Sequence, residues 1–324
     1  MRTLLIYYTG TYNTRYLTDM AENALKSRGH DVTRIEVRRD APVIDTDGFD
    51  LVGIGYPIYG FNSPLPLNRY IKKLRFRKGQ RYFIYKNSGE TFAINNASDR
   101  VIKRRMKRRG ATLVGQYHFV MPYNIHFPFD RDFIRELLDK DKKLLEVMTH
   151  DLESGNIAKI KSNIFYDIAS AVVSVQKIGG FVNSFFYRVD AEKCVGCMRC
   201  VRECPEQNIS VRKGKIVFGH RCDMCMRCSF YCPADAIKTG FLEGWKVREY
   251  YDLGELSAEG PPTEPYITER SRGFYKCYIR TFADIERRYA ETKKAEASKQ
   301  SGGMPMSDAP ANGAGSDEEN RAEV

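Results

Sequence analysis

Short apolar runs alternate with amphipathic stretches along the first half of the chain. Runs of this length, four to eight residues, are typical of strands buried inside a sheet, and five are predicted at 3–8, 32–37, 51–56, 82–85 and 113–120. Apolar residues at helical spacing predict helices between them, at 17–29 and near 66–75, 98–109 and 131–152. Strands that alternate with helices predict an α/β fold, with a doubly wound parallel sheet and right-handed crossovers.

The pattern changes after this first domain, which we place at 1–156. Residues 157–187 are apolar and predict an amphipathic helical connector, helical up to Gly179-Gly180 and packed on a domain; a helix on a membrane surface is the alternative. Residues 188–240 hold most of the cysteines. An extension at 241–292 should pack on the domains and contain a helix at 274–290. Residues 293–324 are small, polar and charged, which predicts a disordered tail.

Composition adds charge to this picture. The net charge is +11, from 52 Lys and Arg against 41 Asp and Glu. Such a balance is a weak indication of nucleic acid or of an acidic partner, and no nucleic-acid module accompanies it. Seven of the ten residues at 100–109 are basic. They form either a solvated helix face or a patch that docks an acidic redox partner or an anionic membrane surface.

No transmembrane helix is expected, because no stretch of 18 or more apolar residues lacks a charge or an amide. The apolar run at the start is too short for a secretory signal. We therefore expect the protein in the cytoplasm.

Eight of the nine cysteines lie between 194 and 232 as two copies of C-x2-C-x2-C-x3-C-P, 28 residues apart. Cysteines clustered in this way favour a metal centre over a disulfide scaffold. Structural zinc is the alternative, but zinc sites generally use two cysteine pairs separated by a longer loop. Ile209 and Ile237 extend the repeat and should seal a small core. The ninth cysteine, Cys277, has no cysteine neighbour and is expected to be a small buried apolar residue.

The repeat resembles bacterial-type two-cluster ferredoxins, small α+β domains that transfer single electrons at low potential. In such runs the fourth cysteine ligates the other cluster. The resemblance implies one 4Fe–4S cluster on Cys194, Cys197, Cys200 and Cys232, and a second on Cys204, Cys222, Cys225 and Cys228. Residues 188–240 depart from the usually acidic ferredoxins, with ten Lys and Arg against six acids. We therefore expect raised reduction potentials or an acidic redox partner.

Three polar or aromatic loops follow the first, third and fourth predicted strands. In a doubly wound sheet such loops meet at the carboxyl ends of the strands, where ligands bind. The first suits a phosphate, although helix capping by Asn13 or Thr14 explains it equally well. The second offers aromatic faces and the third backbone amides. The predicted binding residues are Thr9, Gly10, Thr11, Tyr12, Asn13 and Thr14, then Pro57, Ile58, Tyr59, Gly60 and Phe61, then Asn87, Ser88, Gly89 and Glu90.

These loops resemble those of flavodoxins, and residues 1–240 together resemble fusions of a flavodoxin-like domain with a two-cluster ferredoxin. The resemblance implies a five-stranded sheet of order 2-1-3-4-5 and an FMN cofactor. It further implies that Thr9, Thr11, Asn13 and Thr14 hold the FMN phosphate, and that Tyr59 or Phe61 flanks the ring. Tyr12 departs from the pattern, because flavodoxins usually have glycine there. Its side chain is expected to crowd the phosphate or to point to solvent.

Three functions agree with these observations. The first is an electron-transfer protein that passes electrons between FMN and two 4Fe–4S clusters. The second is a flavin-dependent reductase of a quinone or small acceptor, with a pocket walled or capped by 122–129. The third is a flavin-free docking module that carries a ferredoxin. No G-x-G-x-x-G follows a strand, so no nicotinamide site is expected. His118 and His126 are expected to pack or to lie at a cofactor edge.

Overall fold

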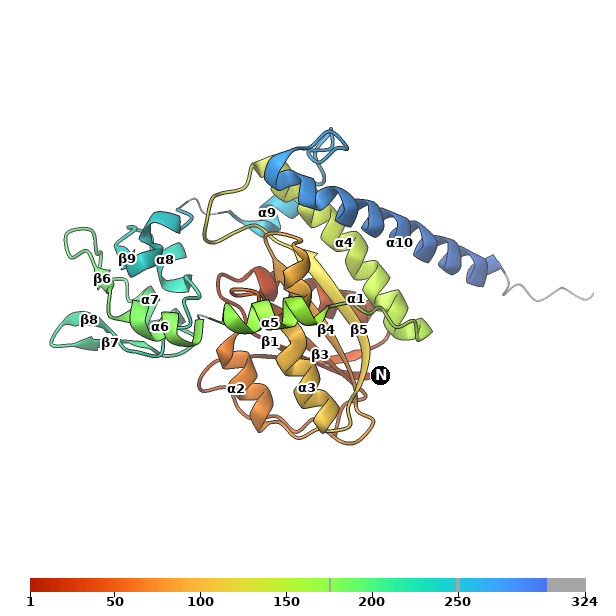
Figure 1. The fold of residues 1–324 in the computed structure, drawn as a ribbon, viewed down its shortest axis with the longest axis horizontal. Coiled ribbons are helices and arrows are strands. Elements are labelled where there is room, and N and C mark those ends of the chain that lie inside the picture. Colours follow the sequence, from red (N-terminus) through yellow and green to blue (C-terminus); the bar gives the residue numbers. More distant parts are fainter. Residues whose placement is uncertain (175, 249–250, 302–324) are drawn as a thin grey trace, which may run out of the picture.

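A computed structural model describes residues 1–324 except 175, 249–250 and 302–324 (Figure 1). Its central sheet is parallel and has the order β2-β1-β3-β4-β5. The strands are β1 (Arg2–Tyr7), β2 (Asp31–Glu36), β3 (Leu51–Pro57), β4 (Arg81–Ser88) and β5 (Thr112–Val120). This is the flavodoxin-like order, so the predicted fold is confirmed.

Helices cover both faces of the sheet because side chains alternate between the faces along each strand. Leu5 and Phe83 point into a core under α1 (Asn13–Ser27) and α4 (Arg131–Ser154). Leu4 and Ile84 point into the opposite core, under α2 (Leu65–Lys73) and α3 (Arg100–Arg108). A 3-10 helix, η1 (Ala93–Asp99), leads directly into α3.

The cysteine-rich part folds as a small α+β domain that reflects its sequence repeat. Each cysteine triplet leads into a short helix, α7 (Arg199–Glu203) and α8 (Arg227–Phe230), which starts after a methionine with left-handed backbone. Ile209 and Ile237 are buried, as expected. Two antiparallel pairs complete the domain: β6 (Tyr187–Val189) with β9 (Ile237–Thr239), and β7 (Ile209–Arg212) with β8 (Lys215–Phe218).

The connector forms two helices, α5 (Ile164–Val172) and α6 (Gln176–Ser184). α5 packs on η1, and the Ser170 carbonyl accepts a 2.8 Å hydrogen bond from Asn62 Nδ2. The helix does not end at Gly179-Gly180, as the sequence suggested, because α6 runs through both glycines. At Gly180 the backbone approaches the Cys222 carbonyl so closely that a Cβ would clash. Gly180 therefore serves a close contact rather than a helix end.

The C-terminal extension packs mainly on α4. Its elements are η2 (Gly240–Trp245), α9 (Leu253–Ala258), η3 (Gly273–Tyr275) and α10 (Lys276–Ser301), and α10 lies along α4 (Figure 1). We expected a helix at 274–290 and disorder from 293, but α10 continues to Ser301. Lys293 pairs with Glu146 of α4, and Glu296 pairs with Arg28 at 2.6 Å. These ion pairs and the high helix propensity of the segment explain the extra turns; the rest of the predicted tail, 302–324, lies outside the described residues.

Candidate functional site

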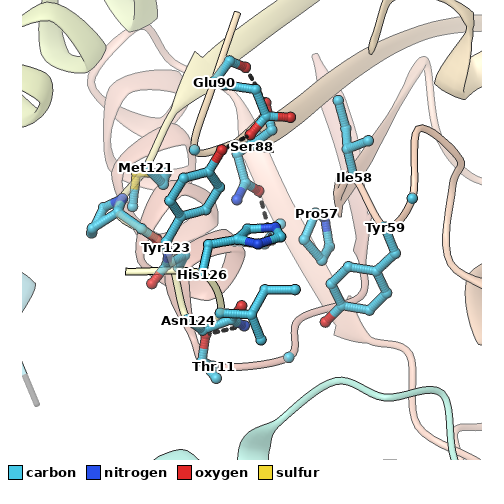
Figure 2. A pocket seen from close by; sticks show the side chains of 18 of the residues that line it. Thr11, Pro57, Ile58, Tyr59, Ser88, Glu90, Met121, Tyr123, Asn124 and His126 are labelled. Carbon is cyan, nitrogen blue, oxygen red and sulfur yellow. Dashed lines mark hydrogen bonds between the residues drawn. The ribbon is translucent and has the colours of Figure 1, made fainter. Parts of the chain in front are cut away.

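A cavity of about 710 Å³ opens at the carboxyl ends of β1, β3 and β4 (Figure 2). We call it the central pocket. It is lined by every residue of the three predicted loops except Tyr12. Its volume lies within the range of roughly 300–1,000 Å³ that is usual for small-molecule and cofactor sites. The three loops therefore meet at one site, as the parallel sheet predicts.

The remaining walls come from parts of the chain far away in sequence. The 121–127 segment contributes one wall, and Tyr123 lies opposite Tyr59 across the pocket, with His126 and Pro57 between them (Figure 2). Met224 comes from the cysteine-rich domain, and Leu242 and Trp245 come from the C-terminal extension that follows it. Sequence reasoning anticipated the 122–129 wall but missed these three residues, because no local pattern reports a contact between domains.

Hydrogen bonds between loops hold the first loop in shape. Asn13 Nδ2 donates to the Pro122 carbonyl at 2.8 Å, and Thr14 Oγ1 donates to Asn87 Oδ1 at 2.7 Å. Thr11 Oγ1 accepts from Asn124 Nδ2 at 3.0 Å. No side chain caps α1, so the capping role considered for Asn13 or Thr14 is wrong. The polar side chains of this loop instead fix the floor of the central pocket.

Two buried hydroxyl groups in the central pocket have no hydrogen-bond partner among the described residues. They belong to Thr9 and Tyr59. A buried hydroxyl without a partner is costly, so both groups suit a polar ligand. Burial raises the pKa of Tyr59 well above its usual value, so its hydroxyl keeps the proton and can donate. Gly10 lies between them, and a Cβ there would lie only 2.7 Å from the Cys225 carbonyl oxygen.

Tyr12 points neither at the pocket nor at solvent, so both expectations for it are wrong. Its backbone is left-handed, with φ of 68°, and this turns the side chain toward the cysteine-rich domain. The hydroxyl donates to Glu203, and the ring centroid lies 5.1 Å from that of Tyr231. A non-glycine residue in this conformation is strained, and contacts across the domain boundary compensate for the strain.

Arg227 is the central contact between the two domains. It lies between Cys225 and Cys228, and only 1% of its side chain is exposed. Nε donates to the Gly10 carbonyl at 2.6 Å and Nη2 to the Thr9 carbonyl at 2.7 Å. Its Nη1 donates to the Glu203 carbonyl, and Glu36 pairs with it at 3.1 Å. The buried guanidinium is stable because Nε, Nη1 and Nη2 each have a hydrogen-bond or ion-pair partner.

The eight clustered cysteines border two small cavities. One is lined by Cys204, Cys222, Cys225 and Cys228, and the other by Cys194, Cys197, Cys200 and Cys232, with Cys228 at its edge. The chain thus brings Cys204 to the second triplet and Cys232 to the first. The ligand assignment stays a prediction, but the arrangement suits it.

Burial makes two of the clustered thiols hard to ionise. Burial raises the pKa of the Cys222 thiol to about 12 and that of Cys225 to about 11. Such thiols stay protonated at neutral pH unless a bound cation stabilises the thiolate. Within the described part of the chain, no three His, Cys, Asp or Glu side chains converge on a single metal ion.

A buried polar network lies beneath the third loop, and the sequence did not reveal it. Lys86 Nζ donates to the Asn95 carbonyl at 3.0 Å and lies 3.2 Å from Asp99 Oδ2. His118 Nε2 lies 2.7 Å from Ser88 Oγ, which lines the central pocket. Burial, with a smaller contribution from Lys86, lowers the pKa of His118 to about 3. His118 is therefore neutral at physiological pH and fixes Ser88.

We compared the chain with known families and structures. A family described as a 4Fe-4S binding domain matches residues 187–209. Solved structures similar to the N-terminal half include the Streptococcus pneumoniae TIGR4 flavodoxin, at 17% identity and a TM-score of 0.36 over 48% of this chain and 99% of that one. Oxidised flavodoxin 1 of Bacillus cereus has 12% identity and a TM-score of 0.35 over 48% and 98%. No curated protein matches the sequence. The chain joins a flavodoxin-like fold to a 4Fe–4S binding domain.

Replacing Arg227 by Met should loosen the domain contact. The change leaves the Thr9 and Gly10 carbonyls and Glu36 without their buried cation, which should lower the free energy of unfolding by about 3–5 kcal/mol. Urea titration followed by circular dichroism measures this. Arg188→Met, which removes an exposed cation from the same domain, should change stability by less than about 0.5 kcal/mol. Equal stability of the two variants would contradict the role given to Arg227.

The half-buried His118 should make stability depend on pH. Its pKa is about 3 in the folded state and about 6.5 when unfolded, so the unfolded state binds the extra proton between these values. The free energy of unfolding should therefore fall by about 1.4 kcal/mol for each pH unit below about 6. In His118→Gln this contribution should vanish. Urea titrations at pH 7.5, 6.0 and 5.0 compare the two proteins, and parallel pH profiles would exclude the assignment.

Proposed function

We propose that the chain is an electron-transfer protein that binds FMN in the central pocket and two 4Fe–4S clusters on the cysteine sets. One observation carries the proposal: the pocket is lined jointly by the three sheet loops and by Met224, which lies between Cys222 and Cys225. The second cysteine set thus adjoins the pocket, and Cys228 joins it to the first set. A flavin exchanges electrons in pairs or singly, whereas each cluster carries one.

The residues of the central pocket fit FMN. Thr9, with its unpartnered hydroxyl, and the uncapped start of α1 provide donors for a phosphate. Tyr59 and Tyr123 provide aromatic side chains on opposite sides of the pocket (Figure 2). Ser88 and Glu90 add polar groups at the far end, where a ring edge would lie.

Two arguments bear on the alternatives. Domain docking uses Tyr12 and Arg227, neither of which lines the central pocket. Docking alone therefore does not explain the pocket, and this disfavours a flavin-free module.

A reductase of a quinone or small acceptor is supported by aromatic side chains that line the pocket beyond the three loops, at Phe92, Phe274 and Trp245. Trp245 is 57% exposed, so this aromatic part reaches the surface. Steady-state turnover with water-soluble quinones distinguishes a reductase from a carrier.

Cofactor content tests the proposal. Protein purified without oxygen should contain about eight iron atoms, eight acid-labile sulfides and one FMN per chain. About two zinc atoms without labile sulfide, or no flavin, would refute it.

The two cysteine sets can be tested in the same way. Cys204→Ala with Cys222→Ala removes two ligands from one proposed set and should leave about four iron atoms. Cys204→Ala with Cys194→Ala removes one ligand from each set and should leave far fewer. If each run of four bound its own cluster, the results would be reversed. Iron analysis and low-temperature EPR of the reduced variants distinguish the two arrangements.

Thr9→Val should weaken FMN but not riboflavin. The substitution keeps the shape of the side chain and removes one hydrogen bond to a charged phosphate, worth about 1.5–3 kcal/mol, or roughly 10- to 150-fold in affinity. Riboflavin has no phosphate and should bind unchanged. Thr33→Val, at an exposed position of β2, is the matched control. Fluorescence titration measures both affinities, and an equal loss for the two flavins would show that Thr9 does not contact the phosphate.

A further inference from the structure

The helix α5 carries an apolar face that nothing in the described chain covers. Its large side chains are mostly exposed, with Ile164 at 68%, Phe165 at 75%, Ile168 at 57% and Val172 at 76%. The spacing of one, four and eight residues places all four on one side of the helix. The opposite side is used for packing, since Ser170 is fully buried and binds Asn62. An apolar face of this kind marks an interaction surface.

Basic residues lie beside this face. Lys159 and Lys161 are exposed immediately before α5. The one acid of the helix, Asp167, is held by Ser162 Oγ at 3.0 Å, and its backbone carbonyl accepts a hydrogen bond from Arg100 Nε. Arg100 starts α3, so the basic helix begins directly beneath α5.

The exposed side of α3 is basic. Ile102 and Met106 are buried against the sheet, whereas Arg104, Lys107 and Arg108 are exposed. Helical spacing places these three on the same side as Arg100. Two other arginines of the run are occupied, because Arg105 and Arg109 donate to carbonyls of α2. The basic run is therefore partly structural, and its exposed charges lie on the helix that begins beneath α5.

We propose that α5 and the exposed cations of α3 form a docking surface for an anionic lipid bilayer. An in-plane helix inserts an apolar face between headgroups while basic residues contact anionic lipids. A second copy of this chain fits worse, because two faces with positive rims would repel each other. Among the described residues no helix is long and apolar enough to cross a bilayer, so contact would be at the surface. Asn62, which binds α5, adjoins the 57–61 loop of the central pocket.

Vesicle binding of the cofactor-loaded protein tests this proposal. The protein should co-float with vesicles of phosphatidylcholine and phosphatidylglycerol (7:3) and at least tenfold less with phosphatidylcholine alone. Binding should weaken as salt rises, because exposed charges are screened. The test does not depend on the proposed redox function, since it measures neither flavin nor cluster chemistry. Failure to bind the anionic vesicles would overturn the proposal.

Two sets of variants separate the apolar and the charged contributions. Phe165→Ser with Ile168→Ser removes exposed apolar groups and should reduce binding at least tenfold with an unchanged circular dichroism spectrum. Arg104→Gln, Lys107→Gln and Arg108→Gln together should also reduce it at least tenfold. The matched control is Lys276→Gln, Arg280→Gln and Lys294→Gln, which removes three exposed cations from α10 and should bind as the unaltered protein does.

Other occupants give different results. If the control triple lost binding as strongly as the α3 triple, only net charge would matter and the proposed surface would be wrong. Sedimentation velocity in the absence of vesicles tests self-association. A dimer that the Phe165→Ser, Ile168→Ser variant converts to monomer, together with no vesicle binding, would assign the face to a second copy and overturn the proposal.

Discussion

The relation between the two halves of the molecule depends on one buried guanidinium. Arg227 lies within the second cysteine run and donates hydrogen bonds to the carbonyls of Thr9 and Gly10, in the first loop of the sheet. A charge in this position is stable only if the surrounding groups stay in place. Arg227 therefore fixes both the first loop and the second cysteine run, and it also fixes the distance between them. Met224, three residues before Arg227 in the same run, lines the central pocket together with the loops.

Tyr12 shows how a second domain can change the sequence of a binding loop while the central pocket stays open. The left-handed backbone at this position is one that glycine adopts easily, and a tyrosine there must be held by other contacts. Glu203, Tyr231 and Arg227 provide them from the cysteine-rich domain. The side chain leaves the ligand side of the loop free. A departure that looks unfavourable for phosphate binding in the sequence is, in the structure, part of the contact between domains.

The sheet, its strand order and the grouping of the three loops were predictable, because they depend on local periodicity and on the geometry of parallel strands. The burial of Ile209 and Ile237 was likewise predictable from their matching places in the repeat. Contacts that depend on how the two domains meet were not predictable. Met224, Leu242 and Trp245 have no local pattern that marks them as pocket residues. Lys86 was not predicted for a different reason: it directly follows the apolar run 82–85, which looks like an ordinary core strand. The continuation of α10 past 293 depends on ion pairs with α1 and α4 that composition does not report.

The hydrogen bonds of Arg227 to the first loop end on backbone carbonyls rather than on side chains. Every residue has a carbonyl, so these bonds place no demand on which side chain stands at position 9. Natural variation or directed evolution at that position can change ligand preference while domain attachment persists. Position 10 has no such freedom, because any side chain there meets Cys225. Positions 9 and 10 are adjacent in one loop, yet position 9 should tolerate substitution and position 10 should not. A mutant library of this protein should therefore vary position 9 and keep Gly10.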